Sequence, residues 1–163
     1  MKRMDINFTS ASEKDIATII RLAHKIWHEH YPAIITVEQI DYMLDTRYSA
    51  AAIAQQMQDS ERYFLASLNE QPVGYASIEW KGQYYYLHKF YLDVAKHGTG
   101  IGEAFFNFLL QHTDTSKTIK LQVNRQNYKA INFYFKMGFV IEQVGDFHIG
   151  KEYYMNDFVM IRK

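Results

Sequence analysis

Apolar residues recur at helical spacing through the first third of the chain. A short apolar–polar run at 5–11 predicts a strand, and Ser12 and Asp15 then stand at the spacing of a capping box that starts a helix. The apolar positions of this helix follow the i, i+3, i+4 pattern: Ile16, Ile19, Ile20, Ala23, Ile26 and Trp27. Residues 36–44 and 49–57 predict two further short helices.

The pattern then becomes that of strands, most clearly at 118–124, where apolar and polar residues alternate. The other predicted strands are 62–69, 72–80, 84–92, 139–145 and 153–163. Asn69 to Pro72 joins the first two and predicts a hairpin. Helices with one apolar stripe each are predicted before and after 118–124, and the second ends at Gly138, a typical C-cap residue. This order predicts a mixed α/β protein.

One stretch between a strand and a helix is rich in glycine. It reads AKHGTGIGEAFFNFLL, Ala95–Leu110, with Gly98, Gly100 and Gly102 at alternate positions. Glycines let the backbone approach a ligand closely, and the first amides of a helix are unpaired and attract anions. Glycines before a helix are also ordinary turn residues, so both interpretations stand. The chain lacks a Walker G-x-x-x-x-G-K-[ST] string, and the last glycine comes one place too early for a dinucleotide G-x-G-x-x-G motif.

A second motif supports a different phosphate-bearing ligand. Asn127–Phe139, NYKAINFYFKMGF, spells N-x-x-A-x-x-F-Y-x-x-x-G-F. Together with the H-x-x-G-x-G of His97, Gly100 and Gly102, it resembles the GNAT superfamily of N-acetyltransferases over essentially the whole chain. The resemblance implies one domain, 1–163, of α/β (α+β) class, with a mixed, mostly antiparallel sheet splayed at the cofactor slot and helices on both faces. His97 departs from the Arg or Gln that is usual in the family.

The resemblance implies acetyl-CoA as the cofactor. The glycine loop would bind its pyrophosphate, and the strand before the loop would pair with its pantetheine arm. The residues implied to bind coenzyme A are Tyr91, Leu92, His97, Gly98, Thr99, Gly100, Ile101, Gly102, Glu103, Asn127, Ala130, Phe133 and Lys136. Asn127 is also placed as a helix N-cap, and Lys136 is equally well explained as a solvated lysine.

Tyr134 is the expected general acid. In the GNAT family the Tyr of the F-Y pair commonly protonates the departing coenzyme A sulfur. A phenol, with a pKa of about 10, is close enough to an alkyl thiol for this proton transfer. Tyr134 also lies on the apolar stripe of its helix, where a tyrosine is otherwise a core residue.

His88 is the expected general base. Family members often use a Glu on the strand entering the glycine loop, and His88 stands near that position, on the strand face expected for Tyr86, Phe90 and Leu92. Imidazoles ordinarily titrate at about 6.5, which suits a base at neutral pH. A histidine among aromatic residues is also common as a hydrogen-bonded core residue. Glu79 on the preceding strand is the reserve candidate.

The acceptor is expected to be a small-molecule primary amine. The candidate acceptor-binding residues are Trp27, His28, Glu29, Tyr31 and Glu79. The early run HEHYPAIITVEQIDYML and a tail with Phe147, Gly150, Asp157, Met160 and Lys163 resemble the bacterial spermine/spermidine acetyltransferase branch. Polyamine is therefore the leading acceptor. An amino acid, a peptide N-terminus or a drug amine remains an alternative, as does a non-catalytic coenzyme A-binding sensor.

Composition narrows the remaining classes of function. The chain has 163 residues, of which 48% are hydrophobic, and a net charge of +0 without a basic cluster, which disfavours nucleic-acid binding. It has no cysteine, so a cysteinyl acyl-enzyme is excluded and direct transfer of the acetyl group is favoured.

No apolar leader or membrane-length segment is seen, so a cytoplasmic protein is expected. A homodimer is common in the superfamily that the chain resembles. His24 and His28 share a helix face but have no third ligand nearby, so no metal site is expected.

Overall fold

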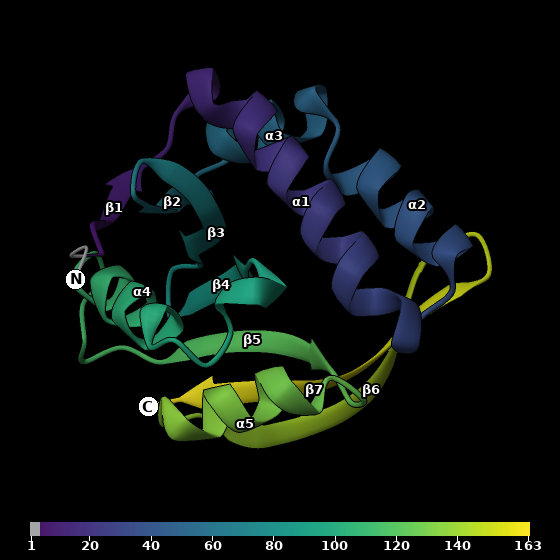
Figure 1. The fold of residues 1–163 in the computed structure, drawn as a ribbon. Coiled ribbons are helices and arrows are strands. Elements are labelled where there is room, and N and C mark those ends of the chain that lie inside the picture. Colours follow the sequence, from purple (N-terminus) through teal and green to yellow (C-terminus); the bar gives the residue numbers. More distant parts are fainter. Residues whose placement is uncertain (1–3) are drawn as a thin grey trace.

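One twisted sheet forms the centre of the molecule (Figure 1). The computed structural model describes residues 4–163, so the first three residues of the expected domain lie outside the described part. The strand order is β1-β2-β3-β4-β5-β7-β6. The strands are β1 (Ile6–Ser10), β2 (Arg62–Leu68), β3 (Gln71–Trp80), β4 (Tyr85–Leu92), β5 (Ile119–Asn124), β6 (Val140–Gly150) and β7 (Tyr153–Arg162). Among these strands of the described residues, only β4 and β5 pair in parallel, which confirms the mixed, mostly antiparallel sheet.

Helices cover both faces of this sheet, as expected (Figure 1). They are α1 (Ile16–His30), α2 (Val37–Arg47), α3 (Ala50–Gln58), α4 (Ile101–Leu110) and α5 (Tyr128–Lys136). Apolar residues of α1, α2 and α3 form one core cluster with the sheet, and those of α4 and α5 form a second cluster on the other face. Burial of both clusters fixes the two helical layers on the sheet.

Local sequence signals position several element ends where they were predicted. The Ser12 amide donates to the carboxylate of Asp15 at 2.9 Å, which forms the expected capping box before α1. Asn69 and Glu70, both at positive φ, make the tight turn between β2 and β3. Gly138 ends α5 at φ 94°, a conformation that favours glycine over other residues.

The sheet opens in its middle, between the two parallel strands. β4 and β5 pair only through Tyr85 with Ile119 and Tyr86 with Lys120. Beyond these pairs β4 stays with β3, and β5 stays with β7 as far as Asn124. The two strands therefore diverge toward the glycine loop, and the splay implied by the family resemblance is confirmed.

A β-bulge at His88 changes the direction of the side chains along β4. The register between β3 and β4 shifts there by one residue, which leaves His88 without a strand partner. Leu87, Phe90 and Leu92 all pack in the cluster with α4 and α5, while the His88 ring packs on Tyr86 with centroids 4.6 Å apart. The expectation that His88 shares a face with Phe90 and Leu92 is therefore wrong, because the inserted residue breaks the alternation.

The C-terminal hairpin extends further than its sequence pattern indicated. The strand predicted at 139–145 continues as β6 to Gly150, and β6 lies at the edge of the sheet. Val140 and Val144 on this edge are more than half exposed, so apolar character does not mark where the strand ends. In residues 4–163, no helix has the length and apolar character needed to cross a membrane.

Candidate active site

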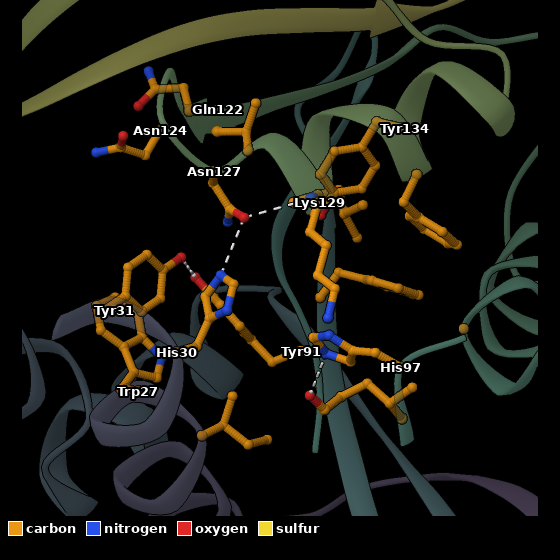
Figure 2. Close-up of a pocket in the computed structure, with 18 of the residues that line it drawn as sticks. Trp27, His30, Tyr31, Tyr91, His97, Gln122, Asn124, Asn127, Lys129 and Tyr134 are labelled. Carbon is orange, nitrogen blue, oxygen red and sulfur yellow. Dashed lines mark hydrogen bonds between the residues drawn. The ribbon is translucent and has the colours of Figure 1, made fainter. Parts of the chain in front are cut away.

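The divergence of β4 and β5 creates a cavity of about 470 Å³ (Figure 2). Its walls come from the C-terminal half of α1, from β4, from the glycine loop and the start of α4, and from β5, α5 and β7. The volume is in the range of sites that bind small molecules or cofactors. The cavity therefore lies where the sequence motifs were expected to meet.

The glycine loop presents free backbone amides to this cavity. Gly98 and Gly100 have φ of 75° and 85°, and Gly100 is the N-cap of α4. Ala104 is the first amide of α4 to donate within the helix, to the Gly100 carbonyl at 3.2 Å, so the amides before it have no helical acceptor. Such amides at a helix N-terminus bind anions well. The loop is thus suited to the phosphates of a nucleotide cofactor.

Three lysines add positive charge at the same end of the cavity. They are Lys96, Lys129 and Lys136. Lys136 Nζ also lies 3.1 Å from Glu103 Oε2, and both side chains are largely exposed. The expected phosphate contact of Lys136 therefore competes with an ion pair inside the chain.

His97, the residue that departs from the family motif, ties the loop to the end of β4. Its Nε2 donates to the Leu92 carbonyl at 3.0 Å, which requires the proton on that nitrogen. The Leu92 carbonyl, which was expected to pair with the pantetheine arm of the cofactor, therefore already accepts a hydrogen bond from His97. The imidazole holds the loop against the strand and leaves the loop amides open.

Asn127 links α5 to α1 across the cavity (Figure 2). Its side-chain oxygen accepts from the Ala130 amide at 3.4 Å, which confirms the N-cap, and lies 3.1 Å from Nε2 of His30. Burial lowers the pKa of His30, although the hydrogen bond to Asn127 opposes this. His30 is therefore a neutral donor at physiological pH.

Tyr134 lines the cavity from the second turn of α5. Its ring packs against Phe133 and Phe139 with centroids 5.6 Å and 5.5 Å apart. Burial raises the pKa of the Tyr134 phenol above its usual value, and the neighbouring Tyr31 adds to the effect. The hydroxyl therefore keeps its proton at neutral pH.

The two expected base candidates contact each other. His88 Nε2 lies 2.8 Å from Glu79 Oε1, and Lys81 Nζ lies 3.3 Å from the same oxygen. Although partial burial alone would raise the pKa of Glu79, hydrogen bonds with His88 and Lys81 lower it overall. Glu79 is therefore an anion that can orient the imidazole, and His88 is the member of the pair that lines the cavity.

Most of the residues expected at the site lie around this one cavity. Those that line it are Trp27, Tyr31, His88, Tyr91, Leu92, His97, Gly98, Gly100, Gly102, Glu103, Asn127, Ala130, Phe133, Tyr134 and Lys136. The other five do not line it. His28 contacts Asp41, Glu29 pairs with Lys25, Glu79 lies behind His88, Thr99 bonds the Lys96 carbonyl, and Ile101 is buried in the core.

Several lining residues were not expected from the sequence. The polar ones are His30, Lys96, Gln122, Asn124, Lys129 and Asp157. Gln122 and Asn124 were visible only as polar positions of an alternating strand, and Asp157 only as part of the tail motif. Within residues 4–163, no three histidine, aspartate or glutamate side chains gather as a metal site.

Comparisons with known proteins agree with this geometry. Residues 33–147 match the family model described as acetyltransferase (GNAT) domain. The chain belongs to the GNAT family of acetyltransferases. An uncharacterised N-acetyltransferase of Mycobacterium tuberculosis is 32% identical over 81% of this chain and 86% of its own length.

A named relative and a solved structure extend the comparison. The spermidine N(1)-acetyltransferase of Thermoplasma acidophilum is 25% identical over 92% of this chain and 99% of its own length. The crystal structure of PaiA N-acetyltransferase from Thermoplasma acidophilum in complex with coenzyme A aligns with a TM-score of 0.84 at 22% identity, over 98% of this chain and 99% of that one. The expected family, fold and acetyl-CoA-dependent N-acetyltransferase activity are thereby confirmed.

Proposed function

We propose that the protein transfers the acetyl group of acetyl-CoA directly to a primary amine of a small polyamine. The observation that carries this proposal is that one cavity collects the glycine loop, Tyr134 and His88. Polyamine as the acceptor is supported by the spermidine N(1)-acetyltransferase relative and by the tail residues that match that branch. A homodimer and a cytoplasmic location remain predictions.

The residues at one end of the cavity suit acetyl-CoA, which supplies the acetyl group as a reactive thioester when bound. The free amides of the glycine loop and the lysines beside them would hold its phosphates. Asn127 and the unpaired edge of β4 would orient the thioester end.

His88 acts as the base in this proposal. An amine with a pKa of about 10.4 must lose a proton before it can attack, which costs roughly 4.6 kcal/mol at pH 7. His88 takes this proton at Nδ1, the ring nitrogen that does not contact Glu79, while Glu79 holds the ring in place. The ion that forms on His88 is stabilised by the adjacent carboxylate of Glu79.

Tyr134 supplies a proton at its hydroxyl to the departing sulfur. Burial raises the pKa of this phenol, which by itself weakens the acid. A thiolate leaving into the same buried space is also destabilised, so its pKa rises in parallel. The near match between phenol and thiol is thus retained inside the cavity.

A panel of amines tests this function by release of coenzyme A, detected with a thiol reagent. The chain has no cysteine, so the enzyme contributes no background signal. Spermidine and spermine are compared with amino acids, peptides and aminoglycosides. Turnover with polyamines above all others is expected. Faster turnover with another class would replace the acceptor, and acetyl-CoA binding without turnover would favour the sensor alternative.

A further inference from the structure

Asp157 on β7 carries a buried oxygen that the chain leaves unsatisfied. Asp157 is only 1% exposed. Its Oδ1 is the only buried side-chain nitrogen or oxygen of residues 4–163 that lacks a hydrogen-bond partner. Buried polar groups almost always have a partner, because leaving one without a partner destabilises the fold. Asp157 also lines the cavity. The unsatisfied carboxylate therefore belongs to the wall of a ligand site.

Neither Arg125 nor Arg47 forms an ion pair with the carboxylate of Asp157. The charges of Arg125 and Arg47 act on Asp157 and oppose the effect of burial. The Arg125 guanidinium, however, donates to Asp146 at 2.8 Å. Asp157 faces Asn124 and Gly145 in the strand register, and neither brings a positive charge.

Asp157 lies on the side of the cavity that holds Tyr31, one of the residues expected to bind the acceptor. Burial raises the pKa of both Tyr31 and Tyr86 to about 12, and the negative charge of Asp157 adds to each shift, whereas the pKa of Tyr134 is raised by burial and by Tyr31. In Figure 2, Asn124, the strand partner of Asp157, lies on the side of Tyr31, and Tyr134 lies on the other. The carboxylate is thus set apart from the expected proton donor.

We propose that Asp157 binds a second ammonium group of the acceptor, one that is not acetylated, and so selects diamines and polyamines over simple monoamines. An ammonium would give Oδ1 the charged donor that it lacks. In this buried position the attraction would be weakly screened by water and salt. This inference rests on the proposed function as an amine acetyltransferase and identifies the residue that would recognise the acceptor class.

The test compares spermidine with butylamine, which has a single ammonium group. The kcat/KM for each amine is measured for the wild type, for Asp157→Asn and for Asp59→Asn, which removes an exposed carboxylate outside the cavity. The ratio of the spermidine value to the butylamine value should fall about 30-fold in Asp157→Asn, the range of a charged hydrogen bond. In Asp59→Asn this ratio should stay at the wild-type value. An unchanged ratio in Asp157→Asn, or an equal loss with both amines, overturns the proposal.

A binding measurement separates this inference from the proposed function. If the wild type acetylates no amine, the proposed function fails, and spermidine is instead titrated calorimetrically into both proteins. Spermidine binding to the wild type that Asp157→Asn loses upholds the role of Asp157. Equal binding to both proteins, or no binding to the wild type, overturns it.

Discussion

His88 Nε2 and Glu79 Oε1 lie 2.8 Å apart on neighbouring strands, at the point where β4 bulges. The bulge places His88 as an extra residue, and Glu79 stands opposite Tyr86 in the register just before it. Backbone geometry therefore brings the imidazole and the carboxylate together. An imidazole held by a carboxylate has its ring orientation fixed, which favours proton transfer at the other nitrogen.

Replacing His88 tests its role as base. His88→Ala should lower kcat/KM about 100-fold at pH 7, the usual range for loss of a general base. The loss should shrink as pH rises, because more of the acceptor is then already a free amine. Rates measured from pH 6 to 10 would show this convergence. His24→Ala, on the exposed face of α1, is the control and should follow the wild type.

Glu79→Gln keeps the hydrogen-bonding shape but removes the charge beside His88. A smaller loss of kcat/KM than in His88→Ala, about tenfold, is expected, because the His88 ring remains held while its protonated form is less stabilised.

A loss of kcat/KM in His88→Ala that is the same at every pH would contradict the base role. In that case His88 would be a structural member of the bulge.

Tyr134→Phe isolates the phenolic proton from the packing of the ring. The substitution keeps the contacts with Phe133 and Phe139, so the unfolding midpoint should change little. The kcat should fall about 100-fold, with little change in KM for acetyl-CoA, because only proton donation is lost. Tyr128→Phe on the same helix, where Tyr128 is 69% exposed, serves as the matched control. Similar rates in the two variants would remove Tyr134 from the mechanism.

Local signals carried most of the fold prediction. The capping box before α1, the turn at Asn69 and the glycine end of α5 each depend on residues a few positions apart, so short-range sequence shows them. The two family motifs predicted that the glycine loop and Tyr134 belong to one site, and both line the cavity. These motifs flank β5, and the splay of the sheet joins them in space.

The remaining features depend on partners far apart in the chain. The bulge at His88 is a property of the pairing between β3 and β4, and periodicity along β4 alone does not show an inserted residue. His30 meets Asn127 across 97 positions. Asp157 reaches the cavity because β7 pairs with β5 in the sheet, although the two strands are not consecutive in the sequence. Sequence patterns identify the residue types here but not which of them meet.

Gly100→Ala tests the anion cradle at the start of α4. Gly100 has φ 85°, which strains any other residue, and Gly82 in the turn before β4 has φ 89° with equally open space around it. Both alanine variants should lose about 1 kcal/mol of unfolding free energy. Only Gly100→Ala should weaken coenzyme A binding, by about tenfold, because only there does the strained backbone carry the free amides. Equal coenzyme A affinity in the two variants, measured by calorimetric titration, would contradict the cradle.

Asp157 should make the stability of the ligand-free protein fall as pH rises. Burial raises the pKa of Asp157 to about 6, although Arg125 and Arg47 oppose the shift. A carboxyl with a higher pKa in the folded state holds its proton more tightly there, so its stabilising effect is full below about pH 4 and is lost by about pH 6.

Asp157→Asn removes this titration and keeps the shape of the side chain. The gain in stability relative to the wild type should grow from about pH 4 and reach its full size, up to about 3 kcal/mol for a shift of this size, near pH 6. Urea unfolding at several pH values, without ligands, measures the difference. Asp59→Asn controls for removal of a charge. A difference between Asp157→Asn and the wild type that does not vary with pH would mean that Asp157 is not held in a buried, unsatisfied state. A gain at neutral pH would instead show that the wild-type fold tolerates an unfavourable carboxylate, as expected of a residue kept for binding rather than for packing.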